Sequence, residues 1–394
     1  MYTTRLMNEV WARDRCAGCA MCVAACSKQV LYWDDAQTAH PQLRHVQKNI
    51  GLSKYTLDTC SFCEHFCEMA CPRLEAAARL EPIAHLSAKA SGMLGGSEPN
   101  DVARNILIAG RASGLIDSAL VVDAERNGAT RARIVTSSGE IAEATGMQLI
   151  WTPLLDALNA AVFNLGLQNI AIVSTPCTAQ AVRRLLDSTH PRLKPYRDAI
   201  RLNVALFCTG EFMPEAFREM MTRGANLKPE QIRRVTAHPH EGILRAQLWN
   251  GDTYEMNLRD AEAYTRAGCA RCDDYVGESA DLAIGSVGAQ EGYATLLVRT
   301  PVGMTFVENA QTMKLIETTD AVDVNALRHA TIDKDRRERA DAFDELQVLM
   351  LDALRDPRKR AEVKQQFDLL YGRERALNRK EDYRYAGCGD CSGC

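Results

Sequence analysis

The chain has 394 residues, of which 46% are hydrophobic and 25% are charged, as in ordinary globular proteins. Its 47 basic and 51 acidic side chains leave a net charge of -4, which gives no electrostatic reason to expect nucleic acid or an anionic membrane as a partner. No stretch approaches the ~18 apolar residues of a membrane span, and residues 1–15 lack the apolar core of a signal peptide. We therefore expect a cytoplasmic protein without a membrane span and with roughly two or three domains.

Eight of the 15 cysteines form two runs near the amino terminus, and the second run ends in Cys-Pro. Disulfide-rich chains are usually small and secreted. A run spaced C-x2-C-x2-C-x3-C instead gives three thiolates to one 4Fe–4S cube and sends the fourth to a neighbouring cube. The simplest assignment joins Cys16, Cys19, Cys22 and Cys71 in one cube and Cys26, Cys60, Cys63 and Cys67 in the other.

Structural zinc is the alternative for these cysteines, because C-x2-C pairs also suit a tetrahedral ion. Two uninterrupted runs of four thiolates argue against zinc. The pattern departs from the usual one at Cys63-x3-Cys67 and at Ser27, which stands where a proline often follows the first run. The number of cubes is therefore better defined than their geometry.

The next elements alternate between helices and strands. We expect a Leu/Ala-rich helical stretch between Arg73 and Gly96, a glycine loop, and then a helix that begins near Asn100 or Asp101 and ends before Gly114. The later order is typical of a mixed or parallel sheet covered by helices. The expected strands are 118–123, 133–136, 169–174 and 202–207, and the expected helices are 152–165 and 179–187.

Beyond residue 226 the sequence pattern changes and predicts a series of short strands. Strands are expected at 244–249 and 254–258 around the hairpin signal Asn250-Gly251-Asp252, and again at 281–285 and 294–299. From 326 onward the apolar spacing is helical. We predict an α+β chain with a ferredoxin-like domain for two 4Fe–4S clusters at 1–80, a mixed α/β central domain at 81–320, and a helical extension at 321–394 with a cysteine-rich tail.

Seven further cysteines lie outside the two runs. Cys177 and Cys208 follow two strands of a predicted β-α-β unit, and open sheets bind ligands at the carboxyl ends of their strands. Together with Cys269 and Cys272 they would hold a third cube, although a lone buried cysteine is often only a small hydrophobic residue. The tail cysteines Cys388, Cys391 and Cys394 are one short of a cube. A partner's cysteine, Asp390, or a cysteine displaced from one of the other sets could complete that set, or the tail is an unliganded terminus.

Several segments resemble the coenzyme F420 hydrogenase/dehydrogenase beta-subunit family. They are 112–122, 174–180, 206–208, Cys269-x2-Cys272-Asp273, 279–288 and 292–300, in the family's order and spanning the chain to about residue 310. The resemblance implies a flavin adenine dinucleotide (FAD) in the central domain with one 4Fe–4S cluster beside it, which supports the central four cysteines as ligands. It also implies a subunit of a hydrogenase, formate dehydrogenase or similar complex, whereas other members act on other substrates with ferredoxin.

A flavin is also what the chemistry needs if the partner is a two-electron carrier, because clusters pass single electrons and a deazaflavin exchanges hydride. Candidate flavin contacts are backbone groups in turns, and each also fits a plain turn. No general acid or base stands out: His238-Pro239-His240 reads as a loop, and Arg233-Arg234 could meet an acidic cofactor tail or form a solvated face. The candidates are Gly95, Gly96, Ser97, Thr175, Pro176, Gly285, Ser286 and Gly288.

Two functions remain open. In the first, the chain is a flavin and iron–sulfur subunit of a hetero-oligomeric oxidoreductase, exchanging hydride with F420 at FAD and single electrons with a catalytic partner subunit. In the second, it is a ferredoxin-dependent flavin reductase of another organic substrate, or an electron-transfer adaptor without F420 activity.

Overall fold

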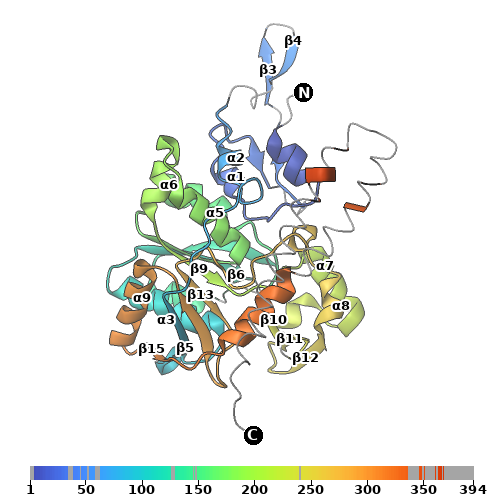
Figure 1. Cartoon of the computed structure of the whole chain (residues 1–394). Helices are drawn as coiled ribbons and strands as arrows, with labels where there is room; N and C mark the ends of the chain where they lie inside the picture. The colour runs from blue at the N-terminus through green and yellow to red at the C-terminus, as the bar shows by residue number, and fades with distance from the viewer. Residues whose placement is uncertain are drawn as a thin grey trace, which may run out of the picture.

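The computed structural model in Figure 1 describes residues 4–33, 39–44, 46–50, 53–57, 63–125, 129–144, 146, 149–238 and 241–335, with a few short pieces between 346 and 367. Cys60 and the tail cysteines Cys388, Cys391 and Cys394 lie outside these residues, as does most of the expected helical extension. None of the helices in the described part of the chain has the length and apolar character that crossing a bilayer requires.

A mixed sheet forms the centre of the molecule. Among the described residues it has eight strands in the order β15-β5-β14-β13-β9-β8-β6-β7. The pairs β6/β8, β8/β9 and β9/β13 are parallel and the others are antiparallel, which confirms the predicted mixed α/β architecture. The strands are β5 (Ala84–Ala90), β6 (Ser118–Ala124), β7 (Thr130–Val135), β8 (Ile170–Ser174), β9 (Ile200–Leu206), β13 (Leu282–Gly285), β14 (Ala294–Val298) and β15 (Ile316–Thr319).

Helices cover both faces of this sheet. Ile106, Ile141 and Phe306 of α3, α4 and α9 are buried against one face, and Leu155 and Val182 of η4 and α5 against the other. Burial of apolar surface is the main force that holds such layers together. The helices are α3 (Pro99–Ala112), α4 (Ser138–Glu143), η4 (Leu154–Ala157), η5 (Ala160–Asn164), α5 (Pro176–Asp187), α6 (Lys194–Ala199) and α9 (Pro301–Thr312).

The cysteine-rich amino-terminal part, called here the ferredoxin-like module (the described residues up to 80), packs on the face covered by α5 and α6 (Figure 1). Its Met21 and Phe66 belong to the same apolar cluster as Leu155 and Val182. The hairpin β3/β4 projects away from the rest of the molecule in Figure 1. The module contains η1 (Leu6–Trp11), α1 (Met21–Ala24), β1 (Leu31–Tyr32), β2 (Gln42–Leu43), β3 (Val46–Ile50), β4 (Ser53–Leu57) and α2 (Phe66–Met69).

The prediction of a helical stretch between Arg73 and Gly96 is wrong. Residues 74–83 contain no helix, and the strand β5 follows them between β14 and β15. The backbone N–H of Leu80 donates to Glu278 O (2.7 Å) and that of Ile83 to Val298 O (2.8 Å). Pairing with distant strands therefore outweighs the helical propensity of the Leu and Ala residues here.

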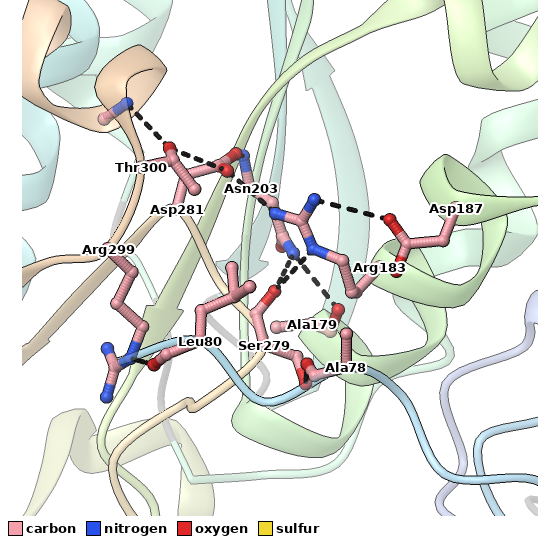
Figure 2. Close-up of polar contacts among 11 residues, drawn as sticks. Ala78, Leu80, Ala179, Arg183, Asp187, Asn203, Ser279, Asp281, Arg299 and Thr300 are labelled. Carbon is pink, nitrogen blue, oxygen red and sulfur yellow. Dashed lines mark hydrogen bonds and ion pairs between the residues drawn. The ribbon is translucent and has the colours of Figure 1, made fainter. Parts of the chain in front are cut away.

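A buried polar network fastens the last residues of the ferredoxin-like module to the central sheet (Figure 2). Asp281 accepts from Arg183 Nη2 (2.8 Å) and from the backbone N–H of Asn203 (2.9 Å). Ser279, two residues earlier, donates its hydroxyl to Ala78 O near the end of the module (2.8 Å). Because the buried carboxylate of Asp281 is paired and hydrogen-bonded, it joins α5, β9 and the start of β13 without an unpaired charge.

A second, smaller sheet lies beside the central one. The predicted hairpin is confirmed, since β11 and β12 are antiparallel around residues 249–252, and β10 adds a third strand that the sequence did not predict. Residues 324–335 are helical, where the helical extension was expected to begin. This part contains α7 (Pro214–Glu219), β10 (Ile232–His238), β11 (Ile243–Leu248), β12 (Thr253–Asn257) and α8 (Leu258–Glu262).

Candidate functional site

The structure gathers the first predicted set of module cysteines, Cys16, Cys19, Cys22 and Cys71. Burial raises the pKa of the Cys22 thiol well above its usual value, and the thiols of the other three raise it further because they are close. Burial is also the main reason that the pKa of Cys71 rises to about 11. A cluster binds thiolates, so these buried thiols suit a site where iron supplies the compensating positive charge.

Three members of the second predicted set surround one small apolar cavity in the module. Cys26, Cys63 and Cys67 line it together with side chains such as Trp11 and Phe66. The fourth predicted member, Cys60, lies outside the described residues. The structure therefore brings together the described part of this set.

The central cysteines converge at the edge of the sheet. Helix α5 begins at Pro176, earlier than the expected 179, so Cys177 lies in its first turn, and Cys208 follows β9. Because β8 and β9 are parallel, their carboxyl ends meet at the same edge. Burial and the neighbouring thiols of Cys269 and Cys177 raise the pKa of Cys208, and Cys177 packs against Cys272.

The four central cysteines are too far apart to bind a single metal ion together. Within the described ranges, no three His, Cys, Asp or Glu side chains are close enough together to hold one metal ion. A cube makes a different demand, because its four thiolates bind separate iron atoms of one larger body.

Charged residues that the sequence analysis did not single out surround the central set. Burial raises the pKa of Glu211 to about 7, and the Glu211 backbone N–H donates to Cys269 Sγ (3.4 Å). Lys334 Nζ donates to Cys208 O (3.3 Å) and Thr209 O (2.7 Å). The sequence offers one sign of these charged neighbours, which is that Glu211 comes three residues after the predicted ligand Cys208.

The first module set and the central set meet directly. The guanidinium of Arg266 lies 4.5 Å from the ring centre of Trp151, and its Nη1 donates to Ala17 O (2.9 Å). Gly268 leaves no room for a side chain, because a Cβ atom there would lie 2.0 Å from Cys16 O. The loop that carries Cys16 and the loop that carries Cys269 are thus in backbone contact.

A cavity of about 190 Å³ opens beside the central cysteines. It is called here the sheet-edge cavity, and it is lined by residues after β9 and β13, by 97–100 at the start of α3, and by 235–238 of β10. Thr209, the residue after Cys208, is among its walls. Gly285 permits the close approach of Phe207, because a Cβ atom at 285 would lie 1.9 Å from the Phe207 ring.

The predicted flavin contacts divide into two groups. Ser97, Gly285 and Ser286 line the sheet-edge cavity. The other five do not line it: Gly95 and Gly96 precede this wall, Thr175 and Pro176 lie beside Cys177, and Gly288 accepts from the backbone N–H of Asp323 (2.8 Å). Sequence reasoning missed Phe207, Tyr275, His238 and Tyr293, which also line the cavity.

Two arginines, Arg104 of α3 and Arg234 of β10, lie close to each other with few compensating groups. Burial and the nearby charge of Arg234 lower the pKa of Arg104. Arg234 has two buried nitrogen atoms, Nε and Nη2, that lack a hydrogen-bond partner among the described residues. Arg104 and Asn100 line a small cavity, and Asn100 also lines the sheet-edge cavity.

A second cavity of about 760 Å³, called here the acidic cavity, shares Thr209 and Tyr275 with the sheet-edge cavity. Its walls carry more negative than positive side chains. The charged or titratable residues that line it are Glu241, Arg259, Glu262, Asp323, His329 and Asp333.

Comparison with known proteins agrees with this arrangement. Residues 167–324 match the family described as the C terminus of the coenzyme F420 hydrogenase/dehydrogenase beta subunit. Residues 15–74 match the 4Fe–4S dicluster domain. The two matches cover the central cysteines and the module cysteines respectively, so the amino-terminal part is an iron–sulfur domain.

Relatives extend the likeness over most of the chain. An uncharacterized protein of Methanocaldococcus jannaschii is 30% identical over 85% of this chain and 98% of its own length. The coenzyme F420 hydrogenase subunit beta of Methanococcus voltae is 28% identical over 55% of this chain and 76% of its own. A chain of the F420-reducing [NiFe] hydrogenase complex from Methanosarcina barkeri shares the fold, with a TM-score of 0.62, 21% identity, and coverage of 68% of this chain and 93% of that one. The protein therefore belongs to the coenzyme F420 hydrogenase/dehydrogenase beta-subunit family, with an amino-terminal ferredoxin-like 4Fe–4S domain.

Proposed function

We propose that this protein is the flavin- and iron–sulfur-containing electron-transfer subunit of an oxidoreductase complex, with FAD in the sheet-edge cavity and F420 as its hydride partner. The observation that carries the flavin assignment is the pair of Arg104, one turn after the lining residue Asn100, and Arg234, which precedes the lining residue Val235 and has two buried nitrogen atoms without a hydrogen-bond partner among the described residues. Family membership supports the F420 assignment, since a relative is an F420 hydrogenase subunit.

An anion is the group that such a pair of arginines lacks. Two neighbouring guanidinium groups repel each other, and buried N–H donors without acceptors cost free energy. Arg104 has one carboxylate nearby, Asp101, at 3.4 Å. The α3 amino terminus adds partial positive charge at residues 98–100. A diphosphate would satisfy these groups, and Asn100 lines both the sheet-edge cavity and the small cavity that Arg104 lines.

The residues that would hold the redox groups form a continuous series. Ser97, Gly285 and Ser286 would contact the flavin, and Thr209 links this cavity to Cys208. A bound flavin supplies the exchange between a hydride and two single electrons. The cysteines would hold three 4Fe–4S clusters, one by Cys26, Cys60, Cys63 and Cys67, one by Cys16, Cys19, Cys22 and Cys71, and one by Cys177, Cys208, Cys269 and Cys272.

The proposed organisation has a ferredoxin-like domain at 1–80, a flavin domain at 81–320, and a helical extension at 321–394. A catalytic subunit such as a hydrogenase or formate dehydrogenase is the proposed partner. The tail cysteines would bind a further cluster or metal at the contact with that subunit.

Equilibrium FAD binding to the full, iron–sulfur-loaded chain tests the flavin assignment. Arg234→Gln should weaken binding about 10- to 100-fold, because a hydrogen bond to a charged group contributes about 1.5–3 kcal/mol. The matched control is Arg233→Gln, whose parent side chain is exposed and 5.8 Å from the ring centre of Trp249. Equal affinities for wild type and Arg234→Gln would contradict the diphosphate site.

The acidic cavity favours keeping a second candidate function. Its four carboxylates do not complement the acidic tail of F420, so a ferredoxin-dependent reductase of a neutral or cationic organic substrate fits this surface. Anaerobic mixing of the FAD-loaded protein with reduced F420 separates the two. Bleaching of the flavin or clusters by F420 supports the first function, and bleaching by reduced ferredoxin alone supports the second.

A further inference from the structure

Arg73 connects the ferredoxin-like module to the central cysteines. It follows Cys71-Pro72 in sequence, and its side chain reaches the loop that carries Cys269 and Cys272. Its Nη2 donates to Gly268 O (3.4 Å) and its Nη1 to Arg271 O (3.1 Å). Each bond therefore ends on the carbonyl immediately before a predicted ligand.

The fork of a guanidinium suits this task, because it makes two hydrogen bonds in a fixed relative orientation and keeps its charge when buried. The Nε atom of Arg73 is buried, with no hydrogen-bond partner among the described residues. The guanidinium lies close enough to Cys272 and Cys177 for their thiols to raise the pKa of Arg73, and its charge opposes the effect of burial on the pKa of Cys177. Arg73 thus contributes a fixed positive charge beside the central set.

A positive charge has a defined effect on a buried cluster. One-electron reduction adds a negative charge to the cluster, and a nearby cation stabilises the reduced form more than the oxidised form. Charge, hydrogen bonding and solvent exposure around a cluster are the features through which a protein sets its reduction potential. Arg73 supplies the charge, and its hydrogen bonds hold the loop that carries Cys269 and Cys272, from the module rather than from the central domain.

We propose that Arg73 is a positioning residue that holds the Cys269–Cys272 loop through its two carbonyl contacts and raises the reduction potential of the cluster bound by the central cysteines. This inference rests on the proposed central cluster. It makes the reduction potential of that cluster depend on the docked module. The first module set and the central set are then linked by the Arg73 side chain as well as by their proximity.

The test is an anaerobic potentiometric titration of the full, reconstituted chain, followed by electron paramagnetic resonance. The central signal is the one absent from Cys208→Ser. In Arg73→Gln this signal should shift to a lower midpoint potential. Arg73→Lys, which keeps the charge, should stay near wild type. An unchanged central potential in Arg73→Gln would overturn the inference.

Arg184→Gln is the matched control. Arg184 also ties the module to the central domain through backbone carbonyls, with Nε to Met69 O (3.1 Å) and Nη1 to Ala76 O (3.2 Å), but it makes no contact with the Cys269–Cys272 loop among those described. Its central potential should remain at the wild-type value. An equal shift in Arg184→Gln would mean that loosening of the module, not the charge of Arg73, sets the potential.

A folding failure does not leave the inference undecided. If Arg73→Gln fails to take up iron, Arg73→Lys decides, because a lowered central potential in that variant would contradict the role of the charge. Failure of the proposed function has a different signature. Wild-type protein would then hold about eight irons, two cubes' worth, and no signal would depend on Cys208.

Discussion

The backbone contact at Gly268 leads to a sharp prediction for Gly268→Ala. A Cβ atom at this position would lie 2.0 Å from Cys16 O and 2.9 Å from Cys16 C, where ordinary contact begins at 3.4 Å. The loops must therefore separate by about 3.4 - 2.0 = 1.4 Å. The obstacle is backbone, and the Arg266 bond to Ala17 O holds the same two segments together, so neither loop yields easily.

Overpacking of this kind typically costs about 1–3 kcal/mol, and we expect the upper end here because no flexible side chain can give way. Anaerobic urea unfolding of the loaded protein, followed by cluster absorbance, measures the change. Gly139→Ala is the control, since it lies in α4 with its nearest neighbour at 4.0 Å and should be neutral or stabilising by up to about 1 kcal/mol. A Gly268→Ala protein within about 0.5 kcal/mol of wild type would refute the close contact.

Three other perturbations follow from the buried contacts. Asp281→Ala removes the 2.8 Å partner of the Arg183 guanidinium and leaves it only Asp187 at 3.8 Å among the ion pairs described. Urea unfolding should therefore show a loss of about 1.5–3 kcal/mol, and a loss below about 1 kcal/mol would contradict the network in Figure 2. Tyr196→Phe removes the contacts of the Tyr196 hydroxyl with Ala24 O (2.8 Å) and with Asn159 Oδ1, so the same assay should show a loss of about 1–3 kcal/mol, and no loss would mean that the Ala24 bond does not help to hold the module. Because burial raises the thiol pKa to about 11 for Cys71 and about 12 for Cys177, these thiols are protonated in apoprotein at pH 8, and cluster insertion should release protons in a pH-stat; insertion without proton release would show that they are already thiolates.

The sequence predicted the parts of the site that depend on residue type and strand order. Cys177 and Cys208 each follow a strand of one β-α-β unit, and parallel pairing alone brings such positions together. Arg73 could not be identified in this way, because its role depends on contacts across about 195 residues. The sequence offered Arg233-Arg234 as a possible partner of an acidic cofactor tail, but it did not show that Arg234 lies near Arg104. Sequence position gives no sign of either contact.

The error at 73–96 has the same physical origin. Local composition favours a helix, but the acceptors for its backbone N–H groups lie at 278 and 298, far along the chain. The flavin candidates show a second limit of prediction from sequence. Glycines mark positions where backbone comes close to something, and at Gly268 and Gly288 that neighbour is another part of this chain. A glycine-rich turn therefore indicates close approach without indicating what approaches.

The way the module is attached determines where a protein partner can exchange electrons. Met21 and Phe66 lie in a core shared with α5, and Arg184 and Arg266 fix the module from two sides. The spacing between the first module set and the central set is thus fixed by packing rather than by a flexible linker. The first set is largely buried, whereas Cys26, Cys63 and Cys67 are partly exposed. If these cysteines hold clusters as proposed, a docking partner reaches the Cys26 set first, and the first set serves as the internal step toward Cys177 and the sheet-edge cavity.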